Sequence, residues 1–204
     1  MARLRSTATA LAACLVLAGC SGGGADPKAA EPSPSSWPPA SVLDVPEPEL
    51  PDVAYRPRGG DPAARAFIRY VVGEASYVLR TAFVGDFYQH TQASCLICAA
   101  IRDEGERMVS ERYLREGGQW SVLRIVPRPG RVPLPDRYDD ANQVFVYDVV
   151  LVTTPLRRVD EDGTTRETLP ARVVTTRMQV QRYATTRWWV RNWWVPGLDA
   201  SVPV

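Results

Sequence analysis

The spacing of apolar residues changes from a helical period to an alternating one near residue 118. Before that point, apolar side chains recur three and four positions apart from Asp61 to Phe83, which predicts an amphipathic helix. Asp61 provides a side-chain cap, and Pro62 suits the first helical position. Gly85 is expected to stop this helix.

A second helix is expected to open at Ser94, which is a typical capping residue. Its apolar face would extend to Leu114, and Gly117-Gly118 would end it. Residues 86–93 carry no clear period, so one short turn of helix is the most that they suggest.

After residue 118 the pattern favours β-strands rich in Val, Thr, Tyr and Trp. Strands are expected over 120–126, 143–154, 171–183 and 187–195. A turn at 160–163 would separate the two central strands, and the proline-rich residues 127–135 would form a connection. Helices followed by a run of strands predict an α+β fold, with the helices packed on one face of a curved antiparallel sheet.

The N-terminus has the layout of an export signal rather than of a folded element. Arg3 and Arg5 precede an apolar run of about ten residues, where a membrane span needs about twenty. The run ends in Leu17-Ala18-Gly19-Cys20, the pattern of a bacterial lipobox. We therefore expect a signal peptide over 1–19 and lipidation of Cys20. An ordinary secretory signal cut near Ala18 is the alternative.

Residues 20–58 have the composition of a tether. Nine of the 18 prolines lie between Pro27 and Pro57, among Ser, Gly, Ala and acidic residues. Such a segment lacks a repeating apolar face and is expected to be disordered. Residues 59–204 then form a single domain of ordinary size.

The charge balance limits the possible binding partners, and the ratio of arginine to lysine bears on the source of the protein. Without Arg3 and Arg5 the chain keeps 22 basic and 23 acidic residues, a balance that argues against nucleic acid as a partner. Lys28 is the single lysine beside 23 arginines, which suggests a GC-rich genome. The expected place is the extracytoplasmic side of a cell membrane, held there by lipid.

Several short motifs resemble a family of actinobacterial lipoproteins of unknown function (domain of unknown function 6318). The motifs are Ala66-Phe67-Ile68-Arg69-Tyr70, Gly85-Asp86, Cys95-Leu96-Ile97-Cys98 and Gly117-Gly118-Gln119-Trp120. The order of helices and strands also resembles the nuclear transport factor 2-like fold, a cone in which a curved sheet wraps a long helix. That resemblance implies a homodimer through the sheet, and it transfers no catalytic residues.

Cys95 and Cys98 remain as a pair once Cys14 leaves with the signal peptide and Cys20 carries lipid. Outside the cytoplasm, such a pair favours a disulfide. A thioredoxin-like redox pair is a second interpretation, although the surrounding βαβ pattern is missing. A zinc site is a third, but the sequence has a single histidine, His90, and no second ligand pair.

Three titratable residues are candidates for a pocket in the cone. Asp86 or His90 could act as a general base there, and Asp148 interrupts an apolar strand. The structural alternatives are a turn residue for Asp86, an exposed polar position for His90 and an edge or bulge position for Asp148.

The segment Trp188-Trp189-Val190-Arg191-Asn192-Trp193-Trp194 is a candidate binding surface. Strict alternation in a strand would place Trp189 and Trp193 on one side and Trp188 and Trp194 on the other. One pair would pack in the core, and an exposed pair beside Arg191 could stack on a ligand.

No phosphate-binding loop, dinucleotide fingerprint, zincin helix or serine-nucleophile elbow occurs in the sequence. The sequence therefore favours a tethered, non-catalytic domain that binds a small ligand or an envelope protein, without cofactor or metal. Two alternatives are an isomerase- or cyclase-like enzyme using an acid in the cone, and a purely structural envelope component.

Overall fold

The computed structural model describes residue 39 and residues 44–55, 60–128, 143–183 and 187–196. All described residues belong to one compact unit, which lies within Ser35–Val204. The predicted signal peptide, Cys20 and most of the tether lie outside the described residues.

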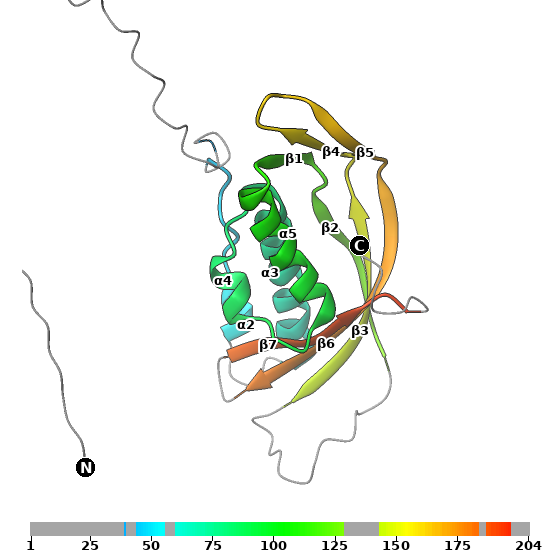
Figure 1. The fold of residues 1–204 in the computed structure, drawn as a ribbon. Helices are drawn as coiled ribbons and strands as arrows, with labels where there is room; N and C mark the ends of the chain where they lie inside the picture. The colour runs from blue at the N-terminus through cyan, green and yellow to red at the C-terminus, as the bar shows by residue number, and fades with distance from the viewer. Residues whose placement is uncertain (1–38, 40–43, 56–59, 129–142, 184–186, 197–204) are drawn as a thin grey trace, which may run out of the picture. The chain divides into compact units, whose positions relative to one another are not determined.

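The described part is an α+β domain, as the change of period predicted (Figure 1). It has four helices and two antiparallel sheets instead of the single sheet expected. The helices are α2 (Asp52–Tyr55), α3 (Gly60–Thr81), α4 (Gly85–Gln89) and α5 (Leu96–Ser110). The strands are β1 (Tyr113–Gly117), β2 (Trp120–Pro127), β3 (Val144–Thr153), β4 (Leu156–Asp160), β5 (Thr165–Leu169), β6 (Arg172–Tyr183) and β7 (Arg187–Trp194).

The larger sheet has the order β2-β3-β6-β7, and the smaller one has the order β1-β4-β5. Only Thr154-Pro155 separates β3 from β4, and only Pro170-Ala171 separates β5 from β6. Because proline has no N–H to donate, these two positions break the ladder, and the β4–β5 hairpin continues beyond the larger sheet (Figure 1). The predicted turn at 160–163 is the turn of this hairpin. The two strands of the hairpin are short and polar, and the sequence pattern did not predict them.

The first long helix ends earlier than predicted. α3 stops at Thr81, where Ala82 takes a left-handed conformation with φ 61°. Its N–H donates to the carbonyl of Val78 at 2.8 Å, which closes the last turn. The expected stop residue, Gly85, instead opens α4.

The second long helix is shorter at both ends. Its cap is Cys95 rather than Ser94, and it ends at Ser110 rather than near Leu114. Residues 113–117 form β1, which pairs with β4, so tertiary pairing overrides the local helical spacing. Gly117-Gly118 is therefore a turn between two strands instead of a helix terminus.

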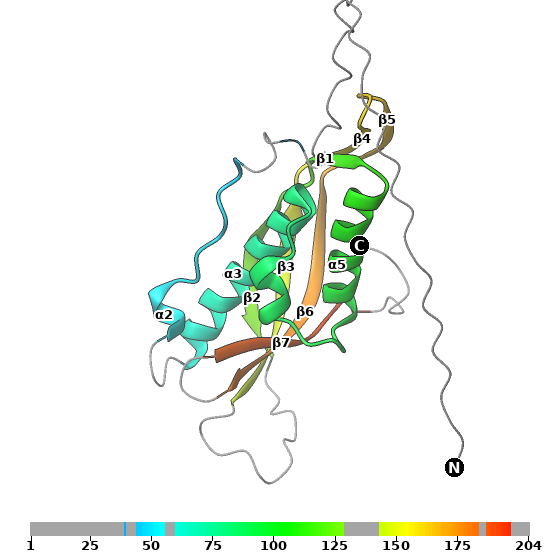
Figure 2. The same cartoon turned by 60° about the vertical axis from the view of Figure 1, so that its left-hand side comes forward.

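α3 and α5 lie on one face of the curved sheet (Figures 1 and 2). The space between them and the sheet is filled mainly by aromatic and aliphatic side chains. Phe67 stacks on Trp188 with ring centroids 5.7 Å apart, and Trp120 meets Trp193 edge to face at 5.6 Å. The fully buried residues of this core include Phe67, Val71, Tyr147, Met178, Trp188 and Trp193.

The packed domain begins before the predicted boundary at residue 59. Ala54 in α2 is fully buried, and its carbonyl accepts a hydrogen bond of 2.8 Å from Trp188 Nε1. Leu50 packs against the same core. The proline-rich composition hid these contacts, because a few apolar side chains docked on a preformed surface create no repeating pattern.

The tryptophans of β7 do not alternate as predicted. Trp188 and Trp193 are both buried in the core, whereas Trp189 and Trp194 are half-buried. The register explains the difference: Val180 pairs with Val190 and Gln179 with Asn192, which leaves Arg191 as an extra residue. This β-bulge shifts the inward-facing position by one residue along the strand.

Candidate functional site: an acidic pocket beside α3 and α4

The five candidate residues predicted from the sequence fall in four places. Asp86 and His90 lie together on the lining of one pocket. Trp193 belongs to the core, and Trp189 stacks on Tyr183 with ring centroids 6.1 Å apart. Asp148 lies elsewhere, on the larger sheet.

Asp148 alternates with the buried Tyr147 and Val149, so it lies on the sheet face that points away from the core. Arg177 and Arg128 donate to its carboxylate at 2.8 and 2.5 Å. Partial burial opposes ionisation, but these two hydrogen bonds keep the pKa of Asp148 below its usual value. Asp148 is therefore an ion-pair residue of the outer face and not an acid on the side of the sheet that faces the helices.

The pocket that contains Asp86 and His90 has a volume of about 630 Å³. We call it the acidic pocket. It lies where residues 46–50 and α2 approach α3 and α4, and its lining residues are Pro46, Glu47, Pro48, Glu49, Leu50, Tyr55, Tyr70, Asp86 and His90. None of these described lining residues is arginine or lysine, whereas three are carboxylates.

The wall formed by residues 46–50 is seated against a glycine of α3. A side-chain carbon added at Gly73 would lie 3.4 Å from Pro48, which places this segment within van der Waals range of α3. Tyr70 lies three residues before Gly73 and Glu74 directly follows it, so these two polar side chains of α3 stand one helical turn apart.

Glu74 is the buried acid of this region. It is 1% exposed, and its Oε1 has no hydrogen-bond partner among the described residues. Burial, together with the charges of Glu47 and Asp86, raises the pKa of Glu74 to about 7. Hydrogen bonds from the Phe87 backbone and from Tyr70 act in the opposite direction without offsetting the burial.

His90 is half-buried against aromatic rings, not freely exposed as the sequence suggested. Its ring meets those of Phe67 and Tyr70 edge to face, with centroids 5.8 and 5.2 Å away. Nδ1 lies 3.0 Å from the carbonyl oxygen of Asp86, which fits a neutral ring that donates from Nδ1. Burial lowers the pKa of His90 from 6.5, so the ring adds no substantial positive charge near pH 7.

The acidic pocket therefore combines negative charge with aromatic surface. Tyr70 is almost fully buried, and burial raises its pKa, so it stays a neutral phenol. Tyr55 is 48% exposed at the rim. Among the described residues, no group of three or more His, Cys, Asp or Glu is arranged to hold a metal ion.

The disulfide expected between Cys95 and Cys98 is present, with a Sγ–Sγ distance of 2.00 Å. Both residues are buried, and the N–H of Cys98 donates to the Sγ of Cys95 at 3.3 Å. The pair thus caps the N-terminus of α5 and packs in the core, which fits a structural bond.

Four residues of this region were not predicted from the sequence: Glu47, Tyr55, Tyr70 and Glu74. Glu47 and Tyr55 lie in the segment that its prolines made look like tether. Glu74 does carry a signal, since a glutamate sits among the apolar face of an otherwise regular amphipathic helix.

Within the described residues, no helix is long and apolar enough to cross a membrane. No known protein family matches the chain, and no curated protein matches it.

Proposed function

We propose that the protein is a lipid-anchored extracytoplasmic binding domain whose acidic pocket takes a small organic cation. The observation that carries this proposal is the lining of the pocket: Glu47, Glu49 and Asp86 around the rings of Tyr55 and Tyr70. Carboxylates attract a cation at a distance, and aromatic faces stabilise it after its water is removed.

The size and form of the pocket favour an organic cation over a bare metal ion. A volume of about 630 Å³ lies within the range of small-molecule sites, about 300–1,000 Å³. Pro48 and Leu50 add apolar surface that a hydrated metal ion would not use. A substituted ammonium group with a short apolar or hydroxylated body matches both parts of the lining.

Binding is favoured over acid–base catalysis in the cone. The side of the larger sheet that faces α3 and α5 carries Tyr147, Val149 and Met178, and the acid expected there, Asp148, is on the other face. Asp86 is exposed in the short helix α4 and bonds to Gln89 of the same helix, at 3.2 Å.

The predicted lipid anchor and the acidic pocket are close together along the chain. Residues 46–50, which form a wall of the pocket, follow directly on the segment that we propose as the tether from Cys20. A ligand site on a domain held close to a membrane surface suits capture of a solute outside the cell.

Calorimetric titration with choline and with its uncharged isostere 3,3-dimethylbutan-1-ol tests the ligand class. We expect choline to bind and the neutral alcohol to bind at least about tenfold more weakly, a difference of about 1.4 kcal/mol. Glu47→Gln and Tyr55→Ala should each weaken choline binding, and both residues are exposed enough for the variants to fold.

Glu161→Gln is the matched control, because this exposed carboxylate pairs with Arg112 outside the pocket. It should leave choline binding unchanged. Equal affinity for choline and the neutral alcohol would show that charge does not select the ligand. Loss of binding in the control as well would show a nonspecific charge effect.

Lipidation is tested separately by metabolic labelling with an alkyne-bearing fatty acid in an actinobacterial host. The label and the membrane fractionation should both be lost in Cys20→Ser and retained in Cys14→Ser, because the lipobox offers Cys20 alone for modification. A labelled, membrane-bound Cys20→Ser protein would refute the anchor.

We also propose that the domain is of the nuclear transport factor 2-like type and belongs with the actinobacterial lipoproteins that it resembles. Support comes from α3 crossing one face of the curved sheet (Figure 2). An isolated parallel bridge between Thr91 and Val190 adds to this, since it ties the connection between α4 and α5 to the strand β7 at the sheet edge.

A further inference from the structure

A second pocket, which we call the arginine pocket, lies between α5 and the strands β1, β2 and β4. Its volume is about 320 Å³. It shares no lining residue with the acidic pocket. Its polar part is built around Glu104, which is 4% exposed.

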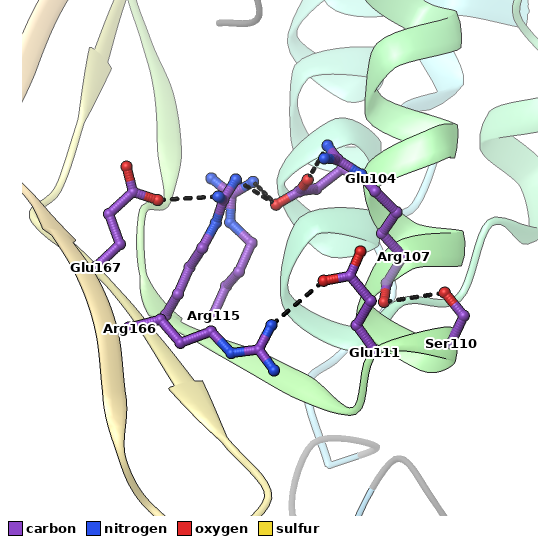
Figure 3. A network of polar contacts seen from close by, with 8 residues as sticks. Glu104, Arg107, Ser110, Glu111, Arg115, Arg166 and Glu167 are labelled. Atoms are coloured by element: carbon purple, nitrogen blue, oxygen red, sulfur yellow. Dashed lines mark hydrogen bonds and ion pairs between the residues drawn. The ribbon is translucent and has the colours of Figure 1, made fainter.

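Two arginines face each other across the β1–β4 ladder at this pocket. Arg115 and Arg158 are direct register partners, a placement of like charges that is normally destabilising. Glu104 Oε1 accepts from both, at 3.1 Å from Arg115 and 2.8 Å from Arg158. Figure 3 shows Arg115 reaching toward Glu104 on α5.

The described lining of the pocket carries three arginines, Arg107, Arg115 and Arg158, against two carboxylates, Asp103 and Glu104. Arg107 also donates to Glu104, from the next turn of α5. Arg158 reaches Glu167 at 2.9 Å with its second guanidinium nitrogen, but its Nε is buried without a partner among the described residues. Burial lowers the pKa of the Arg115 guanidinium, Glu104 opposes this, and the charge of Arg158 lowers it further.

The other part of the arginine pocket is apolar. This part is formed by Leu79 from α3, by Ile97, Ala100 and Ile101 from α5, and by Trp120 from β2. The volume is near the lower end of the range for small-molecule sites, about 300–1,000 Å³. That size admits one short chain or ring system and is too small for a two-chain lipid.

We propose that the arginine pocket binds a small amphipathic anion, with a carboxylate or other oxyanion on Arg158 and Arg115 and a short apolar body against Ile97, Ile101 and Trp120. The anion accepts from the guanidinium groups of Arg158 and Arg115, which line the pocket, and balances the excess of arginines over carboxylates there. Arginine forks suit such oxyanions because they donate two hydrogen bonds at once.

The test uses 1-anilinonaphthalene-8-sulfonate, a fluorescent amphipathic anion, beside the uncharged N-phenyl-1-naphthylamine, which has the same ring system. The expected result is saturable binding of the sulfonate to the mature protein, at least tenfold tighter than that of the neutral dye. Arg158→Gln should weaken sulfonate binding about tenfold, the loss of one charge-assisted contact. Ala100→Trp, on an exposed position of the lining, should block both dyes.

Arg112→Gln is the control, since this exposed arginine pairs with Glu161 away from the pocket. It should bind the sulfonate as the unmodified protein does. Melting curves identify any variant that fails to fold; Ala100→Trp keeps every charge of the cluster and therefore tests the site independently of Arg158.

Competition identifies the source of the anion. Octanoate should displace the sulfonate dye, and vesicles of phosphatidylglycerol should not. Displacement by vesicles alone would overturn the small-ligand proposal in favour of a membrane surface. Unchanged dye binding in both Arg158→Gln and Ala100→Trp would overturn the site itself, while choline binding to the acidic pocket would be unaffected in either case.

Discussion

The protonation of Glu74, the buried acid beside the acidic pocket, makes the stability of the domain depend on pH. Its pKa of about 7 in the folded protein exceeds the ordinary value of 4.5. Between these two pH values the folded state keeps a proton that the unfolded state has released. The free energy of unfolding therefore falls as the pH rises from about 4.5 to about 7, by an amount on the order of 3 kcal/mol for a fully buried group.

Glu74→Gln should remove this pH dependence. At pH 8 the variant should be more stable than the unmodified protein, by on the order of 1–3 kcal/mol, and near pH 4.5 the two should be alike. Urea unfolding at both pH values measures the difference. Glu116→Gln, at an exposed position of β1, serves as control. A variant that is destabilised equally at both pH values would indicate that Glu74 contributes mainly a hydrogen bond.

At the residue scale, the sequence revealed two of the nine lining residues of the acidic pocket. Asp86 and His90 are four residues apart and could be noticed together. Glu47, Tyr55 and Tyr70 come from three segments whose meeting depends on how residues 44–55 dock on α3. Asp148 was singled out because it interrupts an apolar strand, yet a polar residue on an outward-facing position produces the same pattern as one facing a cavity.

At the scale of the element, the bulge at Arg191 decides which tryptophans are structural. Trp188→Ala should cost about 3–5 kcal/mol, because it empties a core position and removes the hydrogen bond to Ala54. Trp189→Ala should cost about 1 kcal/mol or less, since it loses mainly the stacking on Tyr183. Chemical denaturation of the two variants compares them directly. Equal costs would contradict the shift of register.

Two glycines in turns provide a second test of element geometry. Gly117 has φ 75°, and a side-chain carbon there would lie 2.1 Å from the carbonyl oxygen of Pro155. Gly163 has φ 87° with open space around it. Gly163→Ala should therefore cost about 1–2 kcal/mol from the backbone conformation alone. Gly117→Ala should cost clearly more, because β1 must also move away from Pro155, and the difference in melting temperature measures this added cost.

The long elements of the fold were predictable from the sequence, and the short strands were not. The α+β order follows from the apolar periods, because a long helix and a two-sided sheet each impose a regular spacing. The strands β1, β4 and β5 escaped prediction because they are short and rich in Arg, Glu and Thr. Their stability comes from pairing with each other and from ion pairs such as Arg158–Glu167, which no local pattern records.

At the scale of the whole molecule, the boundary between tether and domain bears on both proposals. Leu50 and Ala54 pack on the core, and the backbone of Ala54 satisfies the buried N–H of Trp188. Residues 46–50 also form one wall of the acidic pocket. Residues 44–55, which follow the proposed tether, are thus part of the folded unit, so the acidic pocket is complete only when they are docked.

A chain beginning at residue 44 should therefore melt at the same temperature as one beginning at residue 21, whereas a chain beginning at residue 59 should melt several degrees lower. The loss follows from exposing apolar surface and from leaving the Trp188 N–H buried without its acceptor, about 1–3 kcal/mol for the latter. The chain beginning at residue 59 should also lose choline binding while keeping sulfonate-dye binding, because the arginine pocket uses no residue before Leu79. If it retained both its stability and choline binding, residues 44–58 would be tether after all, as their composition first indicated.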